Sequence, residues 1–219
     1  MGPLPHVPTA VLAVEAAGAL EQALLWLRGG EVVAFPTDTV YGLGAALDDV
    51  AAIARLFEVK ERSRHQGIPL LLAEVRDVQR VCRDVPQEAW LLAERFWPGG
   101  LSLVLWRRPV VPSLVTGGRP TVAVRLPAHP WPQKLARSLQ LPLVVTSANR
   151  SGAPAPKTAA EVQAHLGGCI PLILDGGTCP GGRPSTIVDL TVDPPALLRA
   201  GPISRGELEA ALERPLADR

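Results

Sequence analysis

The fold is organised around one stretch, Phe35-Pro36-Thr37-Asp38-Thr39-Val40-Tyr41-Gly42-Leu43-Gly44. The apolar residues just before it are typical of a buried strand, which Pro36 ends because proline lacks a backbone donor for the ladder. The residues after it, 48–59, have the periodicity of an amphipathic helix. The stretch therefore predicts a polar loop between a strand and a helix, where α/β sheets commonly bind ligands. An ordinary loop rich in turn-forming residues would have a similar composition.

Composition limits the class of protein. The chain has 219 residues, of which 47% are hydrophobic, enough for one large domain with a single core. The net charge of +1 gives no overall field toward nucleic acid or membrane, so any anion site has to be local. Three widely spaced cysteines predict free thiols in a reducing cytosol. Residues 1–8 lack a signal-peptide pattern and no apolar run is long enough to span a bilayer, so we expect a cytoplasmic protein.

Strand and helix patterns alternate along the chain, which predicts an α/β fold. Polar residues gather where the predicted strands begin or end. Thr158 and Glu161 form a capping-box pattern at the start of one helix. The predicted strands cover residues 31–35, 68–72, 101–106, 121–127, 142–145, 170–174, 185–190 and 196–201. The predicted helices cover residues 16–28, 48–59, 75–82, 86–96, 131–139, 158–166 and 204–212.

Two sets of cationic side chains are expected to need anionic partners. The basic cluster at residues 60–65 follows a predicted helix and could be a solvated helix end, since cations favour helix C-termini. Its lysine and arginines would also suit phosphate. On the strand over 121–127, alternation places Thr121, Ala123 and Arg125 on one face. A buried arginine there needs an anion, either in a structural ion pair or in a ligand.

Taken together, these pieces resemble the YrdC-like family, the threonylcarbamoyl-adenylate synthases. The resemblance covers roughly residues 16–210 in the order typical of the family. Any single piece would be weak evidence, but the ordered set is specific. The matching segments are Pro36–Gly44, Lys60–Arg62, Trp97–Gly99, Thr121–Pro127, Ser147–Gly152, Asp175–Gly177, Ser185–Asp189 and Leu198–Gly201.

The resemblance implies both a fold and a reaction. The expected fold is a twisted, mixed parallel and antiparallel sheet flanked by helices around a large, positively charged cavity. Residues 1–15 would be an N-terminal extension, 16–210 the catalytic domain and 211–219 a tail. The enzyme, a nucleotidyltransferase, would make threonylcarbamoyl-AMP and pyrophosphate from L-threonine, bicarbonate and ATP with Mg²⁺. A downstream transferase complex would then modify adenosine 37 of tRNAs that read codons beginning with A.

The resemblance also assigns roles to single residues, although no protein ligand for the metal is predicted. Thr37, Arg125 and Ser185 would bind L-threonine, and Lys60 and Arg62 would act in catalysis. ATP would be bound by Lys60, Arg62, Thr121, Ser147, Asn149 and Arg199.

Three positions depart from the family pattern, the first being Gly100, which follows Pro98-Gly99 where relatives usually have a second proline. Ile68 stands where relatives often have a cation, and Arg64 or His65 could replace that charge. Ala155 lacks a hydroxyl that relatives supply at this point.

Two other functions would also use a positive cavity. One is a binding module for tRNA or double-stranded RNA without catalysis, which steep salt dependence would reveal. The other is a carbamoyl-adenylate-forming relative from hydrogenase maturation. The chain has no C-x-x-C motif and no length to spare for the additional domains of such proteins, which disfavours the second alternative.

Overall fold

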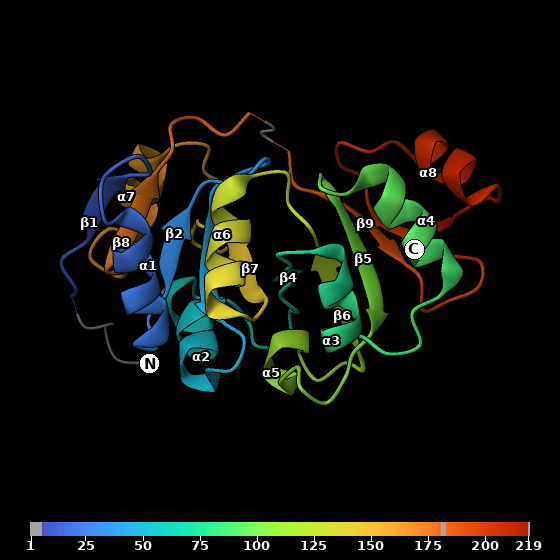
Figure 1. Ribbon diagram of the computed structural model, residues 1–219, viewed down its shortest axis with the longest axis horizontal. Helices are drawn as coiled ribbons and strands as arrows, with labels where there is room; N and C mark the ends of the chain where they lie inside the picture. Colours follow the sequence, from blue (N-terminus) through green and yellow to red (C-terminus); the bar gives the residue numbers. More distant parts are fainter. Residues whose placement is uncertain (1–5, 181–182, 219) are drawn as a thin grey trace.

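The computed structural model describes residues 6–180 and 183–218 (Figure 1). Residues 1–5 and 219 lie outside the described residues. Residues 1–5 begin the expected extension and belong to the segment without a signal-peptide pattern, and residue 219 ends the expected tail. In the described part, eleven strands form one sheet in the order β1-β8-β2-β3-β7-β4-β6-β5-β9-β10-β11. Parallel and antiparallel pairs are mixed, which confirms the predicted sheet type.

Of these eleven strands, eight follow the predicted apolar runs, and the three at residues 10–13, 42–46 and 217–218 were not predicted. The strands are β1 Ala10–Ala13, β2 Val33–Phe35, β3 Gly42–Ala46, β4 Leu70–Leu71, β5 Leu101–Trp106, β6 Thr121–Arg125, β7 Leu143–Ser147, β8 Leu172–Asp175, β9 Thr186–Asp189, β10 Ala196–Arg199 and β11 Ala217–Asp218.

The helices also occur where periodicity predicts them. They are α1 Ala19–Arg28, α2 Val50–Val59, α3 Val78–Val81, α4 Gln87–Phe96, α5 Ser113–Thr116, α6 Pro130–Leu139, α7 Ala159–Leu166 and α8 Arg205–Leu212. A 3-10 turn over Val75–Asp77 precedes α3, so the predicted helix over 75–82 is divided. The capping box of Thr158 and Glu161 is confirmed at α7. The helix α5 lies in a segment predicted as loop.

Two apolar layers hold the helices on opposite faces of the sheet. On one face, Phe35 and Val145 pack in a cluster with Leu27 of α1 and Leu135 of α6. These two helices lie side by side in Figure 1. On the other face, alternate strand residues such as Leu43 join a larger cluster with α2, α4, α7 and α8. The alternation of strand side chains thus produces both layers.

The central stretch is a hairpin, so the predicted direct passage from strand to helix was wrong. The strand β3 pairs antiparallel with β2, and α2 begins only after β3. Gly42 and Gly44 lie within β3 and outside the loop. A Cβ on Gly44 would lie 2.7 Å from Cε1 of Phe35, and one on Gly42 would lie 2.8 Å from Cγ1 of Val145. Both glycines are therefore needed for close packing across the sheet.

Both ends of the described chain contribute edge strands. The strand β1, from the expected N-terminal extension, pairs parallel with β8 at one edge. The strand β11, from the expected tail, pairs parallel with β10 at the other. These segments therefore belong to the same sheet as the rest. Among the described helices, none combines the length and apolar character that crossing a bilayer would require.

Candidate active site

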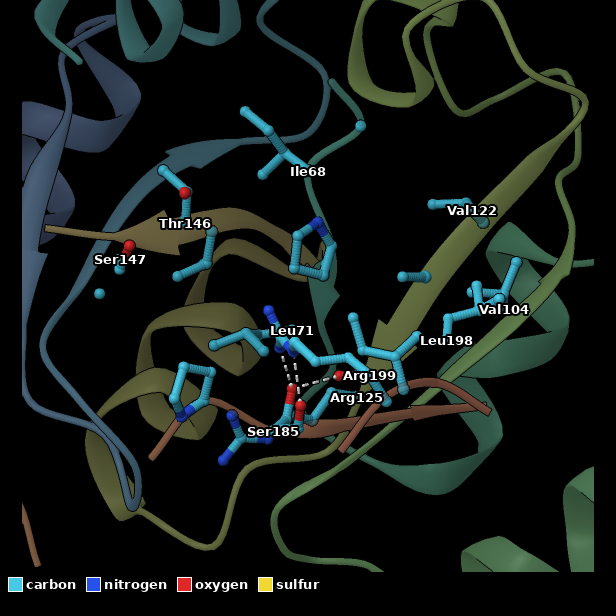
Figure 2. A pocket seen from close by; sticks show the side chains of 18 of the residues that line it. Ile68, Leu71, Val104, Val122, Arg125, Thr146, Ser147, Ser185, Leu198 and Arg199 are labelled. Carbon is cyan, nitrogen blue, oxygen red and sulfur yellow. Dashed lines mark hydrogen bonds between the residues drawn. The ribbon is translucent and has the colours of Figure 1, made fainter. Parts of the chain in front are cut away.

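A cavity of about 570 Å³ opens over the middle of the sheet (Figure 2). Its wall is built by the loop after β2 and by residues of β4, β5, β6, β7, β9 and β10. The sheet therefore brings together residues that are far apart in sequence. Seven predicted site residues lie in the wall: Thr37, Arg62, Thr121, Arg125, Ser147, Ser185 and Arg199.

Thr37 shapes the loop at one side of the cavity. Its hydroxyl donates to the Val40 carbonyl at 2.6 Å and accepts from the backbone N–H of Thr39 at 3.1 Å. These bonds close a hydroxyl-stabilised turn directly after β2. The hydroxyl proton of Thr37 is thus used inside the loop, and the turn holds Thr39 and Asp38 in place.

Arg125 forms a buried ion pair with Asp38 from this loop. Its Nη2 lies 2.6 Å from Oδ1 of Asp38, and its Nη1 donates to Oγ1 of Thr39 at 3.1 Å. Its Nε donates to the carbonyl of Gly99 at 2.8 Å. Burial lowers the pKa of Arg125, whereas Asp38 acts to raise it. The anionic partner that the sequence required is therefore present in the fold, and Arg125 also lies in the cavity wall.

Arg199 and Ser185 form a second polar group beside Arg125 (Figure 2). Arg199 donates from Nε to the Ser185 carbonyl at 2.8 Å and from Nη2 to its Oγ at 3.0 Å. Burial lowers the pKa of Arg199, and the nearby charge of Arg125 lowers it further. Two guanidinium groups with one paired carboxylate leave a net positive charge, which favours an anionic group of a ligand here.

Lys60 is the C-terminal cap of α2, as expected, but it lies behind the wall and is buried, which corrects the expectation that it lies outside the core. The Lys60 residue is only 1% exposed to solvent. Its Nζ donates to the carbonyls of Ser147 and Asn149, each at 2.5 Å, and to Oδ1 of Asn149 at 3.2 Å. Burial, followed by the charge of Arg62, lowers the pKa of Lys60 to about 7. Lys60 therefore holds the loop after β7 and does not form part of the wall itself.

Asn149 is a loop anchor of the same kind. Its Nδ2 donates to the carbonyls of Arg150 at 2.9 Å and Ala153 at 2.6 Å. With Oδ1 accepting from Lys60, the amide is engaged at both ends. Asn149 and Lys60 together set the position of Ser147, which does line the cavity.

Arg62 reaches the cavity from the segment after α2. Its Nη2 donates to the Gly67 carbonyl at 2.9 Å, and its buried Nε has no partner among the described residues. Ile68 lines the cavity nearby, at the side of Figure 2 opposite Ser185 and Arg199. Arg64 is paired with Glu58 at the surface, and neither Arg64 nor His65 belongs to the described wall. Neither therefore replaces the charge missing at Ile68.

The polar residues of the described wall that were not singled out from the sequence include Arg119, Asp189 and Ser102. Arg119 lies near Gly67, its Nη2 3.1 Å from the position of a Cβ there. Asp189 lines the cavity from β9 and accepts from the Thr191 hydroxyl at 2.6 Å. Ser102 lies in β5 and contacts Ser185. Ser102 did have a sequence signal, because it is a lone hydroxyl in the apolar strand Leu-Ser-Leu-Val-Leu-Trp.

Comparison with known proteins identifies the family. A family model described as Sua5/YciO/YrdC, telomere recombination, matches residues 26–201. The chain belongs to this family. A threonylcarbamoyl-AMP synthase of Pyrococcus abyssi is 44% identical over 85% of this chain and 55% of its own length. One from Vibrio vulnificus is 40% identical over 83% of this chain and 98% of its own length.

A solved structure of a Sua5/YciO/YrdC family member supports the same assignment. The crystal structure of P. abyssi Sua5 complexed with L-threonine has a TM-score of 0.91 and 39% identity, over 96% of this chain and 62% of that one. The chain spans little more than half the length of the first curated relatives it matches. The resemblance seen in the sequence motifs is thus confirmed at the level of family and fold.

The described residues contain no group of three or more His, Cys, Asp or Glu side chains suited to hold a metal ion. Mg²⁺ usually binds through one or two carboxylates together with substrate phosphates and water. A dedicated protein cage for Mg²⁺ is therefore not part of the described chain.

Proposed function

We propose that this chain forms L-threonylcarbamoyl-AMP and pyrophosphate from L-threonine, bicarbonate and ATP. The observation that carries the proposal is that two groups of polar residues line the same cavity. One contains Thr37, Arg125, Ser185 and Arg199, and the other contains Arg62, Arg119 and Thr121. The names of the 35–44% identical relatives and the threonine complex of a solved neighbour support the same activity.

The side with Arg125 suits the amino acid. Arg125 and Arg199 are held by fixed hydrogen bonds, so they can meet the threonine carboxylate without reorganising. Ser185 would provide a hydroxyl contact to the same group. Thr37 would act mainly by holding the loop, because its own proton is already donated to Val40.

The side with Arg62 suits the phosphates of ATP. The buried Nε of Arg62 lacks a protein partner among the described residues, and a phosphate oxygen would satisfy it. Thr121 and Ser147 would contact the nucleotide from the wall. Lys60 and Asn149 would contribute by fixing the loop that carries Ser147, and Arg199 would lie between the two substrates.

The proposed chemistry needs positioning and charge stabilisation. The amino nitrogen of threonine attacks the bicarbonate carbon, and loss of water gives the carbamate. A carbamate oxygen then attacks the α-phosphorus of ATP, and the bond to the bridging oxygen of pyrophosphate breaks. The guanidinium groups stabilise the charge that develops on the phosphates. Mg²⁺ bound to ATP would supply further neutralisation of that charge.

The decisive experiment is synthesis by the purified chain. It is incubated with ATP, L-threonine, bicarbonate and Mg²⁺, and pyrophosphate and the acyl adenylate are measured by enzymatic assay and mass spectrometry. We expect both products in equal amounts, and neither when threonine is left out. Pyrophosphate without the acyl adenylate, or no product at all, would contradict the proposal.

Use of the product in tRNA modification rests on the names of the relatives and is part of the same proposal. The acyl adenylate would pass to a downstream threonylcarbamoyl-transferase complex acting on tRNA. Free thiols at Cys82, Cys169 and Cys179 suit a reducing cytosol. Direct binding of tRNA or double-stranded RNA remains the alternative prediction. An affinity that falls steeply with salt, without any synthesis, would favour it.

A further inference from the structure

Ser102 is a buried hydroxyl in the wall of the cavity that the proposed roles leave unused. It is only 1% exposed and lies in β5 between Leu101 and Leu103, which face the apolar core. Within the described part of the chain, its hydroxyl has one side-chain partner, Oγ of Ser185, at 2.9 Å. A polar group this buried is stable only because that bond is made.

Strand register places Ser102 in the middle of the polar groups. It lies opposite Ile187 of β9, and Ile187 lies opposite Arg199 of β10. On the other side, β5 pairs antiparallel with β6, and Leu103 lies opposite Val124. Ser102 therefore lies opposite Arg125, one residue beyond that pair. Side chains in register point to the same face of a sheet. One row across the wall therefore contains Arg125, Ser102 and Arg199.

Proton counting decides which hydroxyl donates. A guanidinium group can only donate, so Ser185 Oγ accepts from Nη2 of Arg199. If Ser185 also donated to Ser102, the buried proton of Ser102 would have no acceptor among the described residues. If Ser102 donates, both lone pairs of Ser185 are occupied and the proton of Ser185 remains free for the cavity. The second arrangement pairs the more deeply buried proton of Ser102. It leaves unpaired only the Ser185 proton, which water or a ligand in the cavity can accept, and is therefore favoured.

We propose that Ser102 is a positioning residue that makes the Ser185 hydroxyl a hydrogen-bond donor to the carboxylate of the bound amino acid. The inference rests on the proposed function and adds to it the direction of one hydrogen bond. Donation from both Ser102 and Arg199 polarises the Ser185 hydroxyl, which strengthens it as a donor. Ser102 acts through Ser185 and does not touch the substrate.

The test compares Ser102→Ala, Ser102→Thr, Ser185→Ala and the double variant Ser102→Ala/Ser185→Ala. Loss of one hydrogen bond predicts that Ser102→Ala raises the KM for L-threonine about three- to tenfold, with the KM for ATP and kcat changed less than about twofold. Ser102→Thr should restore the KM for threonine. Since Ser102 acts through Ser185, the double variant should match Ser185→Ala alone.

A control variant separates this role from simple loss of stability. Thr186→Val removes a neighbouring buried hydroxyl that donates to the Ile203 carbonyl at 2.9 Å, outside the described cavity wall. It should lower the melting temperature without a selective effect on threonine. Additive effects in the double variant, no rescue by threonine at 102, or equal changes in the KM values of both substrates would overturn the inference.

Binding measurements keep the inference testable if synthesis fails. Calorimetry would compare L-threonine with L-threoninol, which lacks the carboxylate, on wild type and Ser102→Ala. The variant should lose affinity for L-threonine by the same factor and keep its affinity for L-threoninol. Wild-type binding without synthesis would contradict only the proposed reaction. Equal loss for both ligands, or no threonine binding by wild type, would overturn the role of Ser102.

Discussion

At the residue scale, the ion pair of Arg125 and Asp38 gives the first prediction. Their side chains are 7% and 15% exposed, so Asp38→Asn leaves a buried cation without its counter-charge. We expect a loss of unfolding free energy on the order of 3 kcal/mol. Because a bound threonine carboxylate would replace the missing charge, L-threonine should raise the melting temperature of the variant more than that of wild type.

A matched control for Asp38 is available at the surface. Glu58→Gln removes the partner of exposed Arg64, and surface pairs contribute at most about 1 kcal/mol. Thermal unfolding with and without L-threonine measures both variants. Equal stabilisation of Asp38→Asn and wild type by threonine would argue that Arg125 is a structural cation only.

Lys60 gives a prediction about pH. Burial and Arg62 lower its pKa from 10.5 to about 7, so between these values the unfolded chain binds more protons than the folded chain. Stability from this group therefore rises with pH above 7 and is constant below it. Relative to Lys60→Met, wild type should gain stability from pH 7 to pH 9, by at most about 1.4 kcal/mol per pH unit.

Urea unfolding of both proteins at several pH values measures that difference. Staying at or below pH 9 limits the effects of Tyr41 and Cys82, whose pKa values burial raises to about 12. Three oxygen acceptors surround Nζ, and only an ammonium group has three N–H donors. A constant difference between the proteins would mean that these bonds keep Lys60 charged up to pH 9.

At the scale of elements, the packing of β3 on β2 gives the third prediction. Gly44→Ala would place a methyl group 2.7 Å from Cε1 and 2.9 Å from Cζ of Phe35. Overpacking of this kind costs about 1–3 kcal/mol of unfolding free energy. Chemical denaturation should show this loss, and Gly44→Ala combined with Phe35→Leu should lose less than the sum of the two single variants. Full additivity would show that the ring is not the obstacle.

At the scale of the whole molecule, binding of both substrates should stabilise the fold. A ligand at a hundred times its dissociation constant adds about 2.7 kcal/mol to the free energy of unfolding. For a chain of this size, that corresponds to a rise in melting temperature of about 5–10 °C. Thermal shift with L-threonine, ATP and both together measures this rise, with D-threonine as control. No shift with any of them would count against the proposed substrates.

Much of the element pattern could be predicted from the sequence, because hydrophobic periodicity is a local property. The strand over residues 101–106 and the capping box at Thr158 agree with the structure residue for residue. The hairpin at β3 was missed, since its sequence, Gly-Leu-Gly-Ala-Ala, has low strand propensity. Those glycines are explained only by the Phe35 ring packed against them.

The sequence by itself determined many of the chemical groups that the cavity contains. Alternation placed Thr121 and Arg125 on one face of a strand, and the ordered motifs indicated the family. Only the tertiary structure decided which of these groups meet. The strand register places Ser102 between Arg125 and Arg199. Lys60 is buried behind the cavity wall. The loop of the β2–β3 hairpin places Asp38 beside Arg125. Arg125 lies 86 residues from Thr39 and 87 residues from Asp38 in the sequence. No local pattern specifies contacts between segments so distant in sequence.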